Sequence, residues 1–201
     1  VTYEGKFYSC KDAVIHPAPL QRPRPPIWVA GTSLETYTYA GENGFLVMAS
    51  AGFTGPDVFK EKFGLWEDAL AARGDDTSNL PRALLHHLHV CEAGEDVGAR
   101  YDQVAEAEGW YLNYRANVNK VALPGEEGSH LKRNWSYELD VRKIIDGGGV
   151  VGAADKVIEE IRRLRDDYGV NDVLVGPWRG PSSKEVTRSL ELFAKEVMPA
   201  L

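Results

Sequence analysis

The chain has 201 residues, of which 43% are hydrophobic and 26% charged, and its formal net charge is −7 at pH 7. The composition is typical of a globular domain, and the acidic balance without a basic stripe argues against a nucleic-acid partner. No apolar run is long enough to span a bilayer and no signal peptide opens the chain, so we expect a cytoplasmic protein without membrane contact.

The cysteines and methionines bear on location and processing. Cys10 and Cys91 lie far apart in the sequence, which favours a reduced compartment and free thiols. The chain starts at Val1, and Met48 and Met198 are its only methionines. We interpret it as a processed chain, an expressed piece of a protein or the rear part of a longer one.

Apolar segments and helical patterns alternate along the chain. After a proline-rich connector, continuous apolar runs predict strands at residues 27–30, 45–49, 83–91 and 172–176. Periodic apolar positions predict helices at 34–40, 56–73, 95–115, 137–145 and 154–168, and a last helix that starts with a Ser182–Glu185 capping box. Strands that alternate with helices indicate βαβ units and a parallel sheet buried on both faces.

Two places depart from this pattern. Glu108 interrupts the apolar stripe of the helix expected at 95–115. The glycine-rich segment 147–152 lacks the spacing of a phosphate-binding loop, so we interpret it as a flexible connection.

The stretch from Pro25 to Gly41 combines a strand with a helix start. It runs from a proline pair into the first apolar strand and turns through Gly31, Thr32 and Ser33 into the next helix. The free backbone N–H groups and the positive end of the helix dipole predict an anion site there, suited to a phosphate. The alternative is that Thr32 or Ser33 only caps the helix.

Both ends of the chain resemble the bacterial luciferase-like flavin monooxygenases. At the front, the resemblance lies in Tyr3-x-Gly5-x-Phe7-Tyr8, in the run from Pro17 to Gly31 and in the Ser33-x-Glu35-Thr36 that follows. At the back, it lies in Gly152, the helix 155–168, Gly169-Val170 and the segment Ser189–Pro199. These motifs are weak singly but fairly specific in their order and spacing.

The resemblance implies a parallel (β/α)₈ barrel of TIM type. Residues 1–201 would be a single luciferase-like domain that forms its second half, strands five to eight, with the active site at the C-terminal ends of the strands. It also implies reduced FMN, or F420 in some branches, as the cofactor, and O₂ as the oxidant of a small organic substrate.

Carried over by position, the resemblance makes Thr32, Ser33 and Thr36 ligands of the flavin phosphate. Gly31 would let the backbone approach the phosphate closely. Some relatives have a Glu-Ser pair where this chain has Thr32-Ser33, so the contacts are expected to differ in detail.

Four further residues are candidates at the mouth of the barrel. Trp178 and Arg179 follow the last strand, where Trp178 would line the pocket and Arg179 would hold the flavin phosphate or an anionic substrate; an exposed loop arginine is the alternative. His87 and His89 share one face of the third strand and would touch flavin or substrate, unless they are packed structural histidines. No third ligand accompanies them in the sequence, so no metal site is predicted.

Four strands do not close a barrel, so a partner is expected. The chain would be the rear part of a whole enzyme, pair with a separate N-terminal half, or form a homo-oligomer, and a flavin reductase would supply the reduced cofactor. The leading hypothesis is a flavin-dependent oxidoreductase or monooxygenase. The alternative is a non-catalytic half-barrel that binds flavin or has only a structural role.

Overall fold

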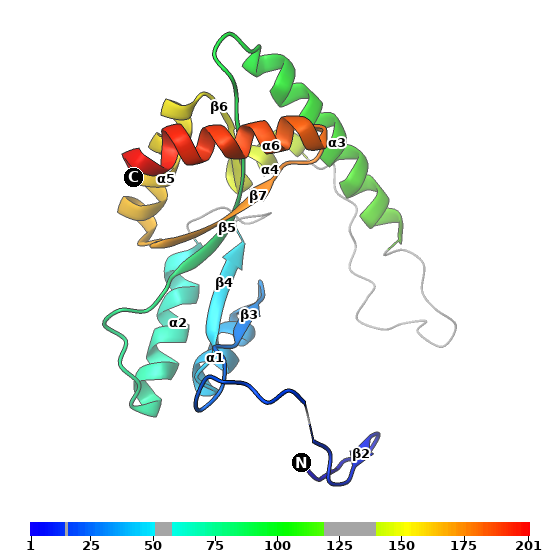
Figure 1. The fold of residues 1–201 in the computed structure, drawn as a ribbon, viewed down its shortest axis with the longest axis vertical. Helices are drawn as coiled ribbons and strands as arrows, with labels where there is room; N and C mark the ends of the chain where they lie inside the picture. Colours follow the sequence, from blue (N-terminus) through cyan, green and yellow to red (C-terminus); the bar gives the residue numbers. More distant parts are fainter. Residues whose placement is uncertain (15, 51–57, 119–139) are drawn as a thin grey trace.

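The computed structural model describes residues 1–14, 16–50, 58–118 and 140–201 (Figure 1). Its main sheet has five strands, β3 (Trp28–Ala30), β4 (Leu46–Ser50), β5 (Ala83–Val90), β6 (Gly149–Gly152) and β7 (Asp172–Pro177). Every pairing in this sheet is parallel. A short antiparallel hairpin, β1 (Tyr3–Glu4) with β2 (Ser9–Cys10), projects away from the body.

Helices connect the strands in the order that the sequence predicts. They are α1 (Leu34–Glu42), α2 (Val58–Arg73), α3 (Val97–Val118), α4 (Val141–Gly148), α5 (Ala154–Tyr168) and α6 (Ser183–Leu192), which continues into a π turn at Phe193–Val197 and a 3₁₀ turn at Met198–Ala200. The predicted capping box at the start of α6 is present, and Gly169 ends α5 with a left-handed φ of 69°. The helix starts expected at 56 and 137 fall outside the described residues.

Strand β5 is the centre of the sheet. Residues 83–85 pair with β4, and residues 87–90 pair with β6. Residues 83–88 pair with β7 at the same time, so β7 occupies one edge of β5 while β4 and β6 share the other. The four strands expected from the apolar runs are confirmed, and the parallel α/β arrangement agrees with the predicted part of a (β/α)₈ barrel.

The helices α1, α2, α5 and α6 pack on one face of the sheet. Leu84 lies in a buried cluster with side chains of α1 and α2, and Leu88 and Val90 lie in a second cluster with α5 and α6. Because side chains alternate along a strand, the odd-numbered residues of β5 face the other way. They include His87 and His89.

The interpretation of residues 147–152 as a flexible connection is wrong. Gly149–Gly152 form β6, and all four residues are buried. Their backbone is held by the ladder with β5, and a Cβ at Gly149 would collide with the carbonyl oxygen of His87 and the ring of Trp178. Glycine is therefore required at position 149 because β5 and the Trp178 ring approach its backbone closely, and not because the segment is mobile.

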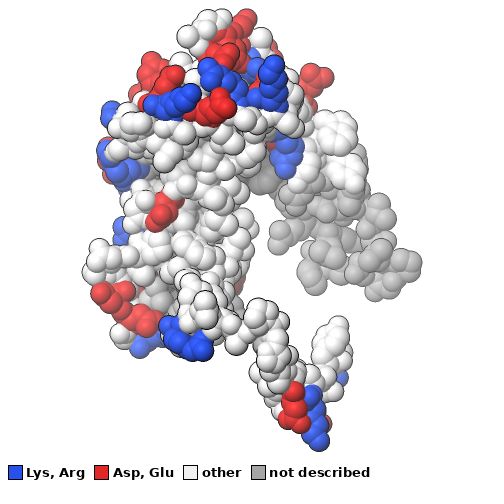
Figure 2. Space-filling view, in the orientation of Figure 1, with Lys and Arg blue, Asp and Glu red and all other residues white. Residues whose placement is uncertain are grey.

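The surface shown in Figure 2 carries acidic and basic side chains interspersed over the end of the molecule that holds α6. Arg188 illustrates this mixture, because it pairs there with both Glu92 and Glu191. Within the residues that the structure describes, none of the helices combines the length and apolar character that crossing a bilayer demands.

We predict that Gly149→Ala lowers the free energy of unfolding by about 1–3 kcal/mol, because the added methyl group overpacks the junction of β5, β6 and Trp178. Gly64→Ala is the matched control: Gly64 lies inside α2 with open space where a Cβ would go. There the change should stabilise the chain by about 0.5–1 kcal/mol. Urea unfolding measures both, and an unchanged Gly149→Ala variant would contradict the packing described.

Candidate functional site

The junction between β3 and α1 gathers small polar groups at a helix start. Ser33 caps α1, and its Oγ accepts a hydrogen bond from the backbone N–H of Thr36 at 3.4 Å. The hydroxyl groups of Ser33 and Thr36 lie 3.1 Å apart. Thr32 and Ser33 are exposed and Thr36 is half-buried, so the group opens to solvent. Ser33 thus caps the helix, and this role does not exclude a ligand, since further N–H groups of the first turn remain without a helical partner.

Gly31 allows the Thr36 side chain to lie close to the backbone between β3 and α1. A Cβ at this position would overlap the methyl group of Thr36. A side chain at residue 31 would therefore displace Thr36 from Ser33 and fill the space in front of the helix start. The arrangement favours a ligand that approaches the backbone closely, as a phosphate does.

Glu35 adds a negative charge to the first turn of α1. The pKa of its carboxyl lies below the usual range, mainly because its own backbone N–H donates a hydrogen bond, with a further contribution from the Ser33 hydroxyl. The Glu35 side chain is thus drawn to the same donors that a bound anion would use. It is exposed, so it can turn away into solvent.

His87 and Trp178 lie together where β5 and β7 meet. Their ring centroids are 4.8 Å apart with planes tilted by 30°, and Gly176 leaves the room that the imidazole occupies. His87 Nδ1 lies 3.3 Å from the carbonyl oxygen of Pro177, a contact that requires the proton on Nδ1. Burial lowers the pKa of His87, which keeps its ring neutral. Trp178 is 5% exposed and donates its Nε1–H to the carbonyl oxygen of Val150, so it is fixed in the interior.

Arg179 points to α3 and pairs with Glu108. Its Nη1 lies 2.9 Å from both carboxylate oxygens of Glu108, and its guanidinium group stacks on Tyr111 at 3.6 Å from the ring centroid. Glu108 is 5% exposed, so the acidic residue that interrupts the apolar stripe of α3 is a buried ion-pair partner. The charge of Arg179 is neutralised within the chain, and its predicted contact with the flavin phosphate stays a prediction.

His89 shares the face of His87 but has other neighbours. It is 3% exposed and lines a cavity of about 660 Å³ between the end of β5, the start of α3 and α6. Burial, with the nearby charge of Arg100, lowers its pKa. The structure therefore places His87 beside Trp178, whereas His89 lies in a separate cavity with other neighbours.

Cys91 and Glu95 are the residues near His89 that the sequence reasoning missed. Burial, followed by the charge of Glu95, raises the pKa of the Cys91 thiol to about 11. Burial pushes the pKa of Glu95 upward, but hydrogen bonds from Arg100 and the Glu92 N–H outweigh it and hold that pKa below the usual range. The spacing His-x-Cys-x₃-Glu at the end of a strand was the available signal.

Comparison with known proteins agrees with this architecture. The sequence profile described as "Luciferase-like monooxygenase" matches residues 1–171. The chain belongs to the luciferase-like monooxygenase family. Curated relatives include the oxygenase component of the flavin-dependent trigonelline monooxygenase of Acinetobacter baylyi, 25% identical, and the alkanal monooxygenase alpha chain of Photobacterium leiognathi, 26% identical. Each match covers 98% of this chain but 54% and 58% of the respective relative.

Solved structures show the same fold. An F420-dependent secondary alcohol dehydrogenase, in complex with an F420–acetone adduct, superimposes with a TM-score of 0.69 and 24% identity, over 100% of this chain and 55% of that one. The oxygenating constituent of 3,6-diketocamphane monooxygenase from Pseudomonas putida, in complex with FMN, gives 0.67 and 21% over 100% and 58%. Both cofactors that the sequence indicated thus occur in solved structures of this fold, and the chain spans little more than half the length of these proteins.

We predict that Arg179→Met lowers the free energy of unfolding by about 1–3 kcal/mol, because it leaves the buried Glu108 carboxylate without its partner. Arg188→Met is the matched control, since Arg188, Glu92 and Glu191 are all about half exposed and such pairs contribute roughly 1 kcal/mol or less. Urea unfolding compares the two variants. An equal loss would contradict the structural role of Arg179, and a loss of FMN affinity without a loss of stability would return it to the cofactor site.

Proposed function

We propose that this chain forms the C-terminal half of a flavin-dependent oxidoreductase, in which FMN places its phosphate at the start of α1. Gly31, Thr32, Ser33 and Thr36 are its proposed phosphate ligands. The substrate is a small organic molecule, and F420 is the alternative cofactor.

The observation that carries this proposal is the open hydroxyl pair in front of the helix start. Ser33 and Thr36 hold their oxygens 3.1 Å apart, and Gly31 leaves the backbone accessible beside them. A phosphate here would accept hydrogen bonds from both hydroxyls and from N–H groups of the first turn, and it would interact favourably with the helix dipole. Thr32, exposed at the turn, offers a third hydroxyl.

We call the proposed phosphate site at the start of α1 the phosphate seat. Its position relative to the other candidate residues supports a flavin as the ligand. Gly31 follows β3, Cys91 follows β5 and Trp178 follows β7, so all three lie at the carboxyl ends of parallel strands. In barrels of this type these ends form the active face. We propose that His87, on this part of β5, faces the substrate with its neutral ring.

When bound, reduced flavin would supply two electrons to O₂, so that one oxygen atom enters the substrate and the other leaves as water. The residues of this chain bind and orient rather than react. Ser33 and Thr36 fix the phosphate end, and the His87–Trp178 pair forms a rigid wall between β5 and β7. A flavin reductase is the proposed source of the reduced cofactor.

The sheet itself argues for a second half. Within the described residues, β3, β6 and β7 each pair with a single neighbouring strand. Trp28 of β3 and Leu174 of β7 expose 44% and 50% of their surface on the sheet face that α1, α2, α5 and α6 leave uncovered. We propose that the N-terminal half of the barrel covers this face, supplied by the same polypeptide or by a separate chain.

A second candidate follows from the same open face. If self-association covers it, the chain would be a half-barrel without turnover, and the seat at α1 would be a remnant of flavin binding. The two candidates differ in FMN affinity, which the first requires and the purely structural form of the second lacks.

We predict that Thr36→Val weakens FMN binding by about tenfold or more, because a hydrogen bond to a charged group contributes about 1.5–3 kcal/mol. The change keeps the methyl group beside Gly31 and replaces the hydroxyl by a second methyl group of similar size. Ser33→Ala should weaken binding similarly, but it also removes the helix cap, so its stability must be measured alongside. Quenching of flavin fluorescence on titration reports the affinity.

Two variants in the same helix make this test specific. Thr38→Val is the matched control, since the Thr38 hydroxyl bonds to the carbonyl oxygen of Leu34 and lies beyond the first turn. Glu35→Gln should tighten binding, because it removes the charge that competes with the phosphate. Equal affinities in the Thr36→Val, Thr38→Val and unmodified chains would remove the phosphate from this seat.

A further inference from the structure

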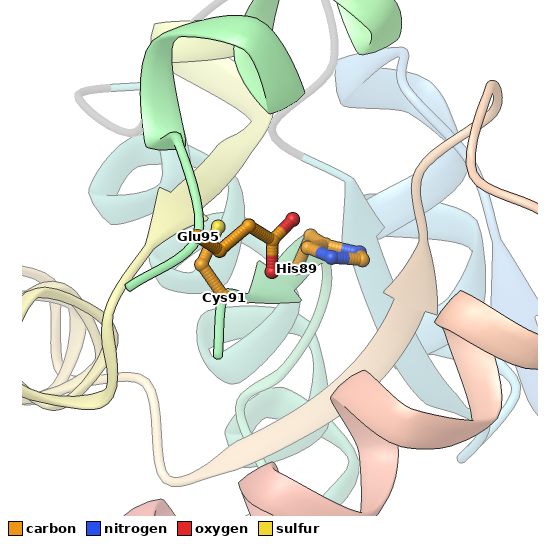
Figure 3. Close-up of side chains that lie close together, drawn as sticks. All are labelled: His89, Cys91 and Glu95. Atoms are coloured by element: carbon orange, nitrogen blue, oxygen red, sulfur yellow. The ribbon is translucent and has the colours of Figure 1, made fainter. Parts of the chain in front are cut away.

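We propose that His89, Cys91 and Glu95 bind a divalent cation of the Zn²⁺ class at the end of β5. Each residue offers one ligand atom, and these three atoms all lie within 4.8 Å of one another. Figure 3 shows the Glu95 carboxylate beside the His89 ring, with Cys91 on the same side of the strand end. This site is separate from the proposed phosphate seat and does not depend on it.

The backbone brings the three side chains together. His89 and Cys91 are two residues apart and therefore leave the same face of the extended chain. The N–H of Cys91 donates to the carbonyl oxygen of Gly152 at 2.8 Å, so the ladder with β6 continues to this residue and fixes it. The loop then folds back, because the N–H of Glu92 donates to Glu95 Oε2 at 2.9 Å.

The Glu95 carboxylate is held in place by an outer layer of partners. Arg100 Nε lies 2.6 Å from Glu95 Oε1, and Arg100 Nη2 lies 2.7 Å from Glu185 Oε1 of α6. A carboxylate has about four lone-pair positions, so these contacts leave acceptor capacity for a metal. Carboxylates that bind metals are commonly oriented by such outer hydrogen bonds.

His89 has the attributes of a ligand without an assigned partner. It is 3% exposed, and its ring nitrogens make no hydrogen bond in the part of the chain that the structure describes, although they line the cavity of about 660 Å³. A buried imidazole normally satisfies at least one ring nitrogen. A cation held with Cys91 and Glu95 would use this nitrogen.

The donor set selects the kind of cation. One nitrogen, one sulfur and one oxygen match Zn²⁺, whereas Mg²⁺ and Ca²⁺ prefer oxygen alone. Tetrahedral Zn²⁺ would draw the three atoms inward by roughly 1 Å, to its bond lengths of about 2.0–2.3 Å. The Cys91 S–H proton would leave to solvent as the metal–sulfur bond forms, and the fourth position would face the cavity.

The experiment is a titration of the untagged chain with Co²⁺, which occupies Zn²⁺ sites and reports its ligands in the visible and near-ultraviolet spectrum. We expect saturation at one Co²⁺ per chain, with a sulfur-to-metal charge-transfer band and the d–d bands of tetrahedral coordination, and displacement by Zn²⁺. Absence of the charge-transfer band, or saturation at another stoichiometry, overturns the proposal.

Variants assign the ligands. Cys91→Ser should abolish the charge-transfer band, and Glu95→Gln should weaken Co²⁺ binding by more than the roughly 10- to 100-fold typical of an outer partner. Cys10→Ser, at the exposed cysteine of the β2 strand, is the matched control and should change nothing. A band that survives Cys91→Ser, or disappears in Cys10→Ser, overturns the site; circular dichroism verifies that each variant is folded.

Discussion

The structure depends on the two-sided pairing of β5. This strand carries β7 along one edge and β4 followed by β6 along the other, so removing it would separate the main sheet into unconnected pieces. Side chains on its two faces have different surroundings. Leu84, Leu88 and Val90 anchor the helices in the buried clusters, while His87 and His89 face away from them. The strand that organises the core thus also carries the polar side chains of the proposed site.

Ion pairs of α3 attach this helix to the frame. Glu108 of α3 binds Arg179 after β7, and Arg100 of α3 joins Glu95 to Glu185 of α6. Arg100 is 12% exposed, so solvent screens its pairs less than those on the surface. These contacts hold the start and middle of α3 over the ends of the strands, which places the helix beside the proposed pocket.

Local patterns in the sequence predicted much of the fold, and contacts between distant residues explain the rest. The four apolar strands and the Ser182–Glu185 cap follow from short-range periodicity, and the family motifs identified the barrel. The pairing of Glu108 with Arg179 spans 71 residues, so no local pattern could show it. Gly149–Gly152 has the composition of a flexible segment and becomes a strand only because β5 offers it a partner. Cys91 and Glu95 become candidate metal ligands only because the loop after β5 folds back toward His89.

In the proposed function, the start of α1 holds the phosphate of a flavin. The affinities of FMN and riboflavin, which share the ring system and differ in the phosphate, measure what this phosphate site contributes to binding. We expect riboflavin to bind at least about tenfold more weakly than FMN, because it cannot accept charge-assisted hydrogen bonds from Ser33, Thr36 and the helix start. Equal affinities for the two flavins would contradict it.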